Sequence, residues 1–274
     1  MGTTRRPLRG LLLPVQGSPQ GLPAVRWLKQ RLYGQCRSRY ESLVQTTAIS
    51  AERILVFGAG RGASELDLRG PGREVVGIDI DRSVLLNPFI DRAVVYDGRR
   101  MPLPDAGFDM CCTHSVFEHL TEPALVFAEL ARVLRPGGHL VFKTPNRWSY
   151  AMLVSQLVPN WLHPRLVRLV TGRQERDTFP TFYRANTRRT LRRLLLTAGF
   201  VEAELHVHLH GADYLAFSLP TYLLGVIYER IVNVSPLFED LRGNIVGDFT
   251  RTPAVPAAAS AAEVHEATRL LGGE

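Results

Sequence analysis

The sequence has few of the residues that disulfide frameworks, zinc sites and membrane spans require. Its 274 residues include three cysteines, and their spacing does not suit a metal, so we expect reduced thiols and a cytoplasmic location. The apolar run Leu11–Leu13 is too short for the core of a secretory signal. The apolar stretch Tyr214–Tyr228 is too short to span a bilayer, and Pro220 interrupts it.

Lysine is also scarce. Only Lys29 and Lys143 are lysines among the 33 basic residues, and the net charge is +7. This balance favours anionic ligands or surfaces and says nothing about the fold. Basic residues accompany a helical pattern between Ala24 and Val44, where solvated helix faces are the simplest interpretation. We expect no nucleic-acid partner.

One glycine-rich stretch organises the chain. Residues Ile54–Phe57 form a continuous apolar run, which is typical of a strand buried on both faces. The run ends at three glycines, Gly58, Gly60 and Gly62. Glycine lets the backbone turn sharply and approach a ligand, and a helical pattern follows from Ala63. A nucleotide-like ligand suits such a turn, although the spacing differs from the dinucleotide fingerprint; a turn without a ligand is the alternative.

Two carboxylates follow at the ends of predicted strands. The strand Glu74–Ile80 carries Asp79, about twenty residues beyond the glycine turn, where an acidic residue can accept hydrogen bonds from ribose hydroxyls. Capping of the next helix is the alternative role, and Asp81 suits it better. The strand Ala93–Tyr96 leads to Asp97, whose carboxylate can accept a hydrogen bond from an adenine amino group.

The rest of the chain predicts further strands and helices, with two added segments. We predict strands at Phe108–Thr113, His139–Lys143, Val201–Val207 and Asn244–Thr250, helices at Glu122–Leu134 and Thr187–Ala198, and a turn at Arg135–Gly138. The segment Arg147–Arg184 predicts two short helices. The segment His208–Gly243 predicts a buried helix pair, with an interfacial membrane segment as the alternative.

Several motifs together carry a resemblance to a known family. They are the glycine turn at 58–62, Asp79, the segment Asp97–Asp109, the pair Glu118-His119 and the turn Leu134–Gly138. In this order they resemble the class I S-adenosylmethionine-dependent methyltransferases of the type 11 group, which includes quinone-biosynthesis enzymes. The resemblance implies an α/β fold with a Rossmann-like, mostly parallel seven-stranded sheet, helices on both faces and an antiparallel last strand. The chain departs from the family at Val56, where relatives usually carry an acid.

The resemblance also implies which residues bind S-adenosyl-L-methionine. Its methionine and ribose portions would lie on Gly58, Ala59, Gly60 and Gly62. Asp79 would hold the ribose hydroxyls. The adenine would contact Ile80, Asp97 and Gly98. Thr113 and His114 would lie beside the methionine moiety.

A general base is expected if the methyl acceptor is a hydroxyl. Glu118 and His119 are the candidate catalytic residues, since they lie just past the fourth strand. Alternatively, His119 only caps a short helix or binds a backbone carbonyl. Some quinone methyltransferases hold a metal through Glu-x-x-Glu-His, but Ser115 occupies the first position here, so we expect no metal.

These features give an expected organisation and function. Residues 1–45 would form a tail and basic helices, residues 46–250 the methyltransferase domain, and residues 251–274 a disordered tail. Segments 147–184 and 208–243 would be cap insertions over the acceptor site. The expected activity is methyl transfer by in-line displacement to a small or lipid-linked acceptor, with peripheral membrane contact. The alternatives are a non-catalytic scaffold, which Val56 favours, and a nicotinamide-dependent dehydrogenase or epimerase, which the glycine spacing disfavours.

Overall fold

The computed structural model describes most of the predicted core. It describes residues 23–33, 38–62, 67–149, 179–208, 215 and 218–253. The start of the helix expected from Ala63, the two helices expected within 147–184 and residues 254–274 of the tail expected at 251–274 lie outside the described residues. Four arginines of the first insertion, Arg165, Arg168, Arg173 and Arg176, lie outside them as well.

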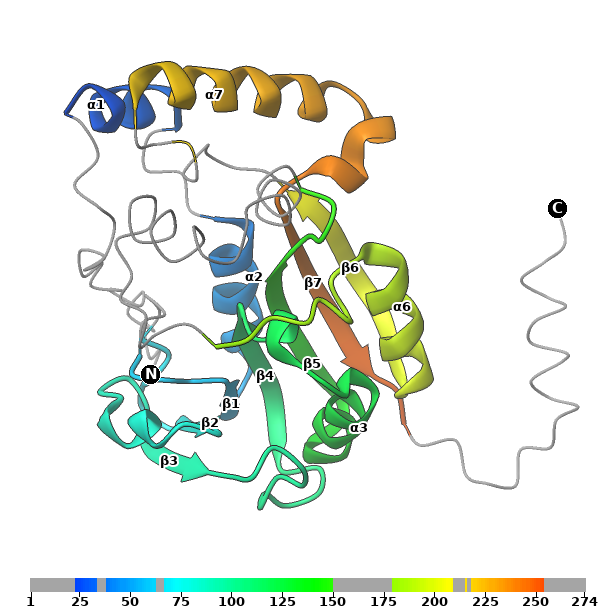
Figure 1. Ribbon diagram of the computed structural model, residues 1–274. Coiled ribbons are helices and arrows are strands. Elements are labelled where there is room, and N and C mark those ends of the chain that lie inside the picture. Colours follow the sequence, from blue (N-terminus) through cyan, green and yellow to red (C-terminus); the bar gives the residue numbers. More distant parts are fainter. Residues whose placement is uncertain are drawn as a thin grey trace, which may run out of the picture.

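Seven strands form one sheet, as the sequence predicts (Figure 1). The strands are β1 (Arg53–Phe57), β2 (Glu74–Asp79), β3 (Arg92–Val95), β4 (Phe108–His114), β5 (Leu134–Pro145), β6 (Phe200–His208) and β7 (Asn244–Arg251). Their order in the sheet is β3-β2-β1-β4-β5-β7-β6. Strands β1 to β5 pair in parallel, whereas β7 runs antiparallel to both β5 and β6. The expected fold class, including the antiparallel last strand, is confirmed.

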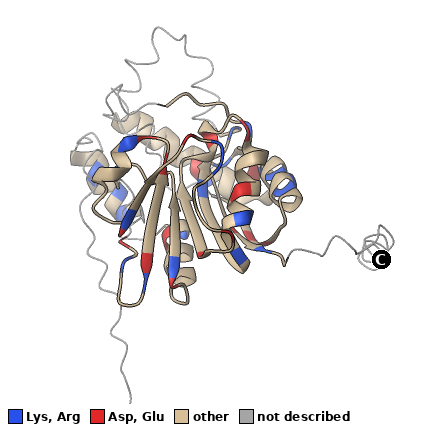
Figure 2. Ribbon diagram, turned by 90° about the horizontal axis from the view of Figure 1, so that it is seen from below, with Lys and Arg blue, Asp and Glu red and all other residues tan. Residues whose placement is uncertain are grey.

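Helices cover both faces of this sheet. The described α-helices are α1 (Pro23–Tyr33), α2 (Arg39–Ala48), α3 (Pro123–Val133), α6 (Arg188–Thr197) and α7 (Leu219–Val234). The described 3-10 helices are η1 (Arg82–Leu86), η2 (Phe117–His119) and η5 (Pro236–Leu241). One apolar cluster joins α2 to β1, β2 and β4, and a second joins α3 and α6 to the sheet. Charged residues lie mainly at strand ends and on helices (Figure 2).

Local sequence signals fix several helix ends. Ser38 and Glu41 form a capping box at the start of α2, and Thr187 caps α6. Helix α6 ends before Gly199, which has a φ of +89°. Helix α2 packs on β4, β5 and β7 of the sheet.

Two local predictions need correction. The turn expected at Arg135–Gly138 lies within β5, which begins at Leu134, and it coincides with the register shift of β5 against β4 and with a left-handed Gly137 at a φ of +77°. Among the described residues of the second insertion, α7 forms one long helix with an exposed face, whereas a buried helix pair was expected. Pro220 lies in the first turn of α7, where its missing N–H costs no hydrogen bond, so it starts the helix.

Candidate active site

The glycine turn follows β1 with a left-handed backbone at all three glycines. Their φ angles are +71°, +45° and +85° for Gly58, Gly60 and Gly62. A Cβ on Gly58 would lie 2.2 Å from Cγ2 of Val116, and one on Gly62 would lie 2.5 Å from Oδ1 of Asn87. No atom lies within 4 Å of a Cβ built on Gly60. The outer two glycines are therefore fixed by packing, and the middle one presents open backbone to a ligand.

Asp79 at the end of β2 holds this turn. Its Oδ2 accepts a hydrogen bond from the Gly60 N–H at 2.8 Å, and its Oδ1 accepts one from the Asp81 N–H at 2.9 Å. Two carboxylate oxygens offer about four lone-pair sites, so acceptor capacity remains for hydroxyl groups. Asp81 caps η1 through the Ser83 N–H at 2.6 Å, which confirms its predicted role.

The ends of β2 and β3 bring the predicted adenine residues together. Ile80 is exposed, and a Cβ built on Gly98 would lie 3.6 Å from its Cγ2. Asp97 is exposed and accepts a hydrogen bond from the Arg99 N–H at 2.9 Å. Ile80 and Gly98 thus face each other, with the Asp97 carboxylate next to them in the chain.

The Tyr96 phenol lies close enough to Asp79 and Asp97 for both carboxylates to affect its pKa. Burial raises the pKa of Tyr96 to about 12, and the negative charges of Asp79 and Asp97 add to the rise. The phenol therefore stays neutral at physiological pH between two ionised groups. Sequence reasoning did not single out this residue, because its role depends on the pairing of β2 with β3.

At the end of β4, a polar pair follows the buried cysteines. Thr113 is buried, and its Oγ1 has no hydrogen-bond partner among the described residues. The next residue, His114, is exposed, and its ring lies 5.4 Å from that of Tyr40 on α2. A buried hydroxyl without a partner costs free energy unless water or a ligand satisfies it.

Together these observations test the fit of S-adenosylmethionine. The chain offers open backbone at Gly60, carboxylates at Asp79 and Asp97, an exposed apolar side chain at Ile80, and a hydroxyl at Thr113 with bonding capacity to spare. A purine nucleoside with an amino-acid tail needs acceptors, donors and an apolar surface of this kind. The residues fit the cofactor.

The position where relatives carry an acid, Val56, packs into the sheet. It lies opposite Gly77 and Cys112 and contacts the apolar cluster beneath α2. In this chain the Asp79 carboxylate makes the hydrogen bond to the crest of the turn, at Gly60. The turn therefore has a carboxylate contact even though residue 56 is apolar.

The candidate catalytic pair lies in η2, just after β4. Glu118 is buried, and its Oε2 accepts a hydrogen bond from the Thr144 hydroxyl at 3.1 Å. Asn186 donates in turn to the Thr144 hydroxyl at 2.6 Å and to the Pro145 carbonyl at 3.1 Å. This network joins η2 to the end of β5 and the start of α6, so the Glu118 carboxylate is held in place.

His119 is oriented by a backbone carbonyl. Its Nδ1 lies 2.9 Å from the Pro180 carbonyl oxygen, and its Nε2 lies 4.0 Å from Oε1 of Glu118. A carbonyl oxygen only accepts, so Nδ1 carries the proton and Nε2 of the neutral ring keeps its lone pair. The backbone bond that we weighed as the alternative to catalysis is present, and it also leaves Nε2 able to take a proton.

An exposed aromatic side chain contacts His119, and a second lies nearby in the chain. The Phe179 ring lies 6.0 Å from the His119 ring, and the exposed Phe182 donates its backbone N–H to the Glu118 carbonyl at 2.7 Å. Arg184 stacks over the Phe182 ring at 5.8 Å and donates to the Thr121 carbonyl at 2.6 Å. The histidine therefore borders an apolar, partly cationic surface.

Sequence reasoning missed several residues that support the site. Val116 contacts the glycine turn and immediately precedes η2, so it links the turn to the catalytic pair. Asn87 donates to the Ala59 carbonyl at 3.0 Å, and the following proline was a local turn signal for it. Arg132 donates to the carbonyls of Met101 and Leu103 at 2.9 Å and so fixes the segment after β3.

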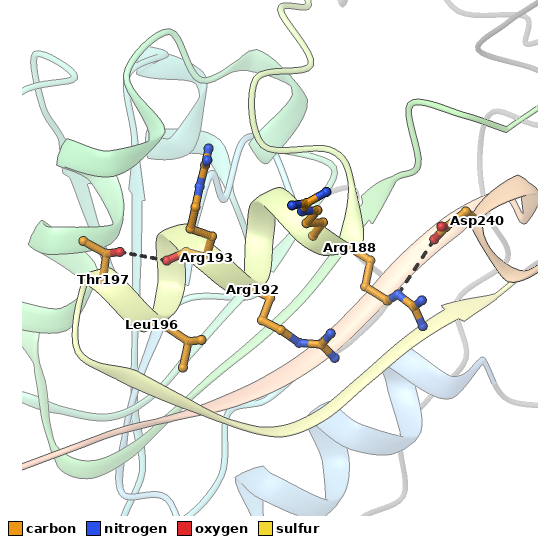
Figure 3. A pocket seen from close by; sticks show the side chains of 7 residues that line it. Arg188, Arg192, Arg193, Leu196, Thr197 and Asp240 are labelled. Carbon is orange, nitrogen blue, oxygen red and sulfur yellow. Dashed lines mark hydrogen bonds and ion pairs between the residues drawn. The ribbon is translucent and has the colours of Figure 1, made fainter. Parts of the chain in front are cut away.

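A separate groove runs along α6 and has a structural explanation. It measures about 620 Å³ and is lined by Arg188, Arg189, Arg192, Arg193, Leu196, Thr197 and Asp240. Figure 3 shows Arg188 reaching toward Asp240, and its guanidinium also pairs with Glu239 at 2.5 Å. Arg192 pairs with Glu202 on β6 at 2.5 Å. These ion pairs tie α6 to its neighbours.

The described residues contain no group of three or more histidine, cysteine, aspartate or glutamate side chains placed to hold a metal. Ser115, where metal-binding relatives carry an acid, has a φ of +56° and donates its N–H to the Lys143 carbonyl.

Comparison with known proteins finds a methyltransferase domain in the part of the chain that contains the glycine turn. Residues 55–142 match a family described as a methyltransferase domain. A protein of Mycolicibacterium smegmatis described as a probable S-adenosylmethionine-dependent methyltransferase is 29% identical over 231 residues, which cover 79% of this chain and 81% of that protein. The ubiquinone biosynthesis O-methyltransferase of Hahella chejuensis is 31% identical over 118 residues, 40% of this chain but only half of that protein.

A solved structure gives the same result for the fold alone. An S-adenosylmethionine-dependent methyltransferase from Archaeoglobus fulgidus superposes with a TM-score of 0.51 at 16% identity, over 83% of this chain and 94% of that one. The family match also decides against the nicotinamide-dependent alternative. The chain therefore carries a methyltransferase domain at residues 55–142 and is similar to S-adenosylmethionine-dependent methyltransferases over most of its length.

Proposed function

We propose that this protein methylates a lipophilic or lipid-linked acceptor and that His119 removes a proton from the attacking group. The observation that carries the proposal is the contact of an oriented His119 with the exposed ring of Phe179, three residues before the exposed Phe182. A pocket for a small molecule is typically lined by apolar and aromatic side chains with a few placed polar groups. An apolar acceptor with one nucleophilic hydroxyl suits that lining.

In the proposed cofactor site, the glycine turn and residues at the carboxyl ends of β2, β3 and β4 share the binding. Gly60 supplies open backbone, Asp79 accepts hydrogen bonds from the ribose, and Asp97 receives the adenine amino group. Ile80 and Gly98 form the apolar and backbone surfaces for the base, and Thr113 and His114 border the methionine portion. When bound, S-adenosylmethionine supplies a methyl group on a cationic sulfonium.

In the proposed mechanism, holding the acceptor in line with the methyl group supplies most of the acceleration, up to about 7–11 kcal/mol in the best cases. Nε2 of His119 takes the proton that the nucleophile loses. The protonated His119 ring is then stabilised by the Glu118 carboxylate, whose Oε1 lies 4.0 Å from Nε2. Two unit charges at about 4 Å attract by roughly 4 kcal/mol at an effective dielectric constant of about 20. Thr144 and Asn186 keep that carboxylate in place.

The test is methyl transfer from labelled cofactor to the lipid and the aqueous fractions of a cell extract. We expect label in the lipid fraction with wild-type protein. His119→Ala should lower kcat about 10²–10⁴-fold and leave cofactor affinity unchanged. His206→Ala is the matched control, because His206 lies exposed on β6 and pairs with Glu204. Label confined to the aqueous fraction would contradict a lipophilic acceptor. Full turnover by His119→Ala would show that His119 is not the general base.

A further inference from the structure

Helix α7 carries an apolar face that nothing in the described structure covers. Four large side chains recur at helical spacing along its length: Leu224, Ile227, Ile231 and Val234. They are 63%, 55%, 54% and 82% exposed. Spacings of three and four residues place them on one side of the helix. We call these four residues the α7 stripe.

The opposite side of α7 is firmly packed. Tyr222 is buried against Val25 of α1 in a small apolar cluster of their own. Tyr228 donates to the Leu241 carbonyl at 2.8 Å, and Arg242 donates to the Val232 carbonyl at 3.1 Å. These contacts hold the inner side of α7 against the protein. The α7 stripe lies on the opposite side of the helix and is therefore exposed.

Neighbouring elements add exposed apolar side chains, and the exposed charges of α1 and α7 are basic, whereas the two acids of η5, Glu239 and Asp240, pair with Arg188. Trp27 of α1 is 68% exposed and Leu237 of η5 is 91% exposed. All charged residues of α1 are basic, and Arg26 and Arg31 are exposed. In α7 the single acid, Glu229, is buried, while Arg230 is exposed. The exposed charges of these two helices are thus all positive.

This surface lies at the edge of the sheet that holds the candidate active site. Helix α7 and η5 connect the end of β6 to the start of β7, next to the end of β5 (Figure 1). Asn146, just past β5, donates to the carbonyls of Asp240 and Arg242 at 2.6 and 2.9 Å. These bonds tie η5, the segment that follows α7, to the carboxyl end of β5.

We propose that α1 and α7 dock the protein on an anionic lipid bilayer, with the α7 stripe and Trp27 in the interface and the arginines against lipid phosphates. An interfacial helix combines one apolar face with basic flanks, and tryptophan favours the membrane–water boundary. None of the described helices is long and apolar enough to cross a membrane. A bilayer with negative headgroups complements the exposed arginines, whereas a second copy docked through the same surface would bring like charges together. The proposal goes beyond methyl transfer and does not depend on it.

The first test is co-sedimentation of the full chain with vesicles, without cofactor or acceptor. We expect binding to phosphatidylcholine vesicles containing about one third phosphatidylglycerol, at least tenfold weaker binding to pure phosphatidylcholine, and weakening at high salt. Ile227→Glu combined with Ile231→Glu should reduce binding at least tenfold. Leu125→Glu is the matched control, because Leu125 is equally exposed on α3 and should bind as wild type. Thermal unfolding of each variant checks the fold.

The second test reads the surface directly and requires no charge insertion. Trp27 fluorescence should shift to the blue on addition of anionic vesicles, and Trp27→Phe should lose that part of the shift. Equal binding by the double glutamate variant and wild type would overturn the proposal, as would equal binding to neutral and anionic vesicles. Absence of vesicle binding together with a dimer that the glutamates dissociate would assign the surface to a second copy. Because no methylation is measured, failure of the proposed activity leaves these results unaffected.

Discussion

Replacing Asp79 with asparagine perturbs the proposed cofactor site without changing its volume. Both carboxylate oxygens accept backbone hydrogen bonds, from Gly60 at 2.8 Å and from Asp81 at 2.9 Å. The asparagine amide has one acceptor oxygen, so its NH2 group must face one of these N–H groups, donor against donor. The substitution therefore loosens the glycine turn or the end of β2, and it removes an acceptor that the ribose hydroxyls would use.

The magnitude follows from the value of a hydrogen bond to a charged group, about 1.5–3 kcal/mol. Since about 1.4 kcal/mol is a factor of ten, the Kd for S-adenosylmethionine should rise about 10- to 150-fold. Loss of the contact at Gly60 should also lower the free energy of unfolding, by about 1–3 kcal/mol for a group left unpaired.

Titration calorimetry with the cofactor and with its demethylated product measures the first effect, and thermal unfolding measures the second. Asp67→Asn is the matched control, because it also removes a carboxylate, one paired with Arg69 at 2.7 Å on the surface. An unchanged Kd in Asp79→Asn would refute the assignment of Asp79 to the cofactor. If the unfolding temperature falls while Kd stays constant, Asp79 only holds the turn.

Three further predictions test other parts of the structure. Gly58→Ala should destabilise the fold by about 1–3 kcal/mol, because its Cβ meets Val116 at 2.2 Å and φ is +71°; adding Val116→Ala should restore part of the unfolding temperature, and a fully stable single variant would contradict the packing. His139 bonds to Asp248 at 3.0 Å, which raises its pKa. The pair contributes at most about 1 kcal/mol to the free energy of unfolding, because it is partly exposed. This contribution is full below the unfolded pKa of histidine near 6.5 and is lost as pH rises through the higher folded pKa. The urea midpoint of wild type should therefore change with pH in this range, and that of Asp248→Asn should not. In His119→Ala, calorimetry should find the cofactor affinity of wild type, and a large loss would move His119 into the cofactor site.

Elements with local signals could be predicted from the amino-acid sequence alone. The apolar run Ile54–Phe57 became a doubly buried strand, because a parallel sheet covered on both faces needs apolar side chains on both sides. Asp81 and Thr187 became caps, since their side chains satisfy N–H groups only two or three residues away. Glycines with a left-handed backbone marked the turn after β1.

Features that depend on contacts between distant segments could not be predicted before the chain was seen folded. The network of Glu118, Thr144 and Asn186 joins residues 26 and 42 positions apart, and no local pattern specifies that meeting. The apolar composition of α7 predicted burial, but α1 and η5 cover only its inner side, so the stripe remains exposed. Burial of a helix depends on which elements the fold packs against it, and the hydrophobicity of the helix does not predict those elements.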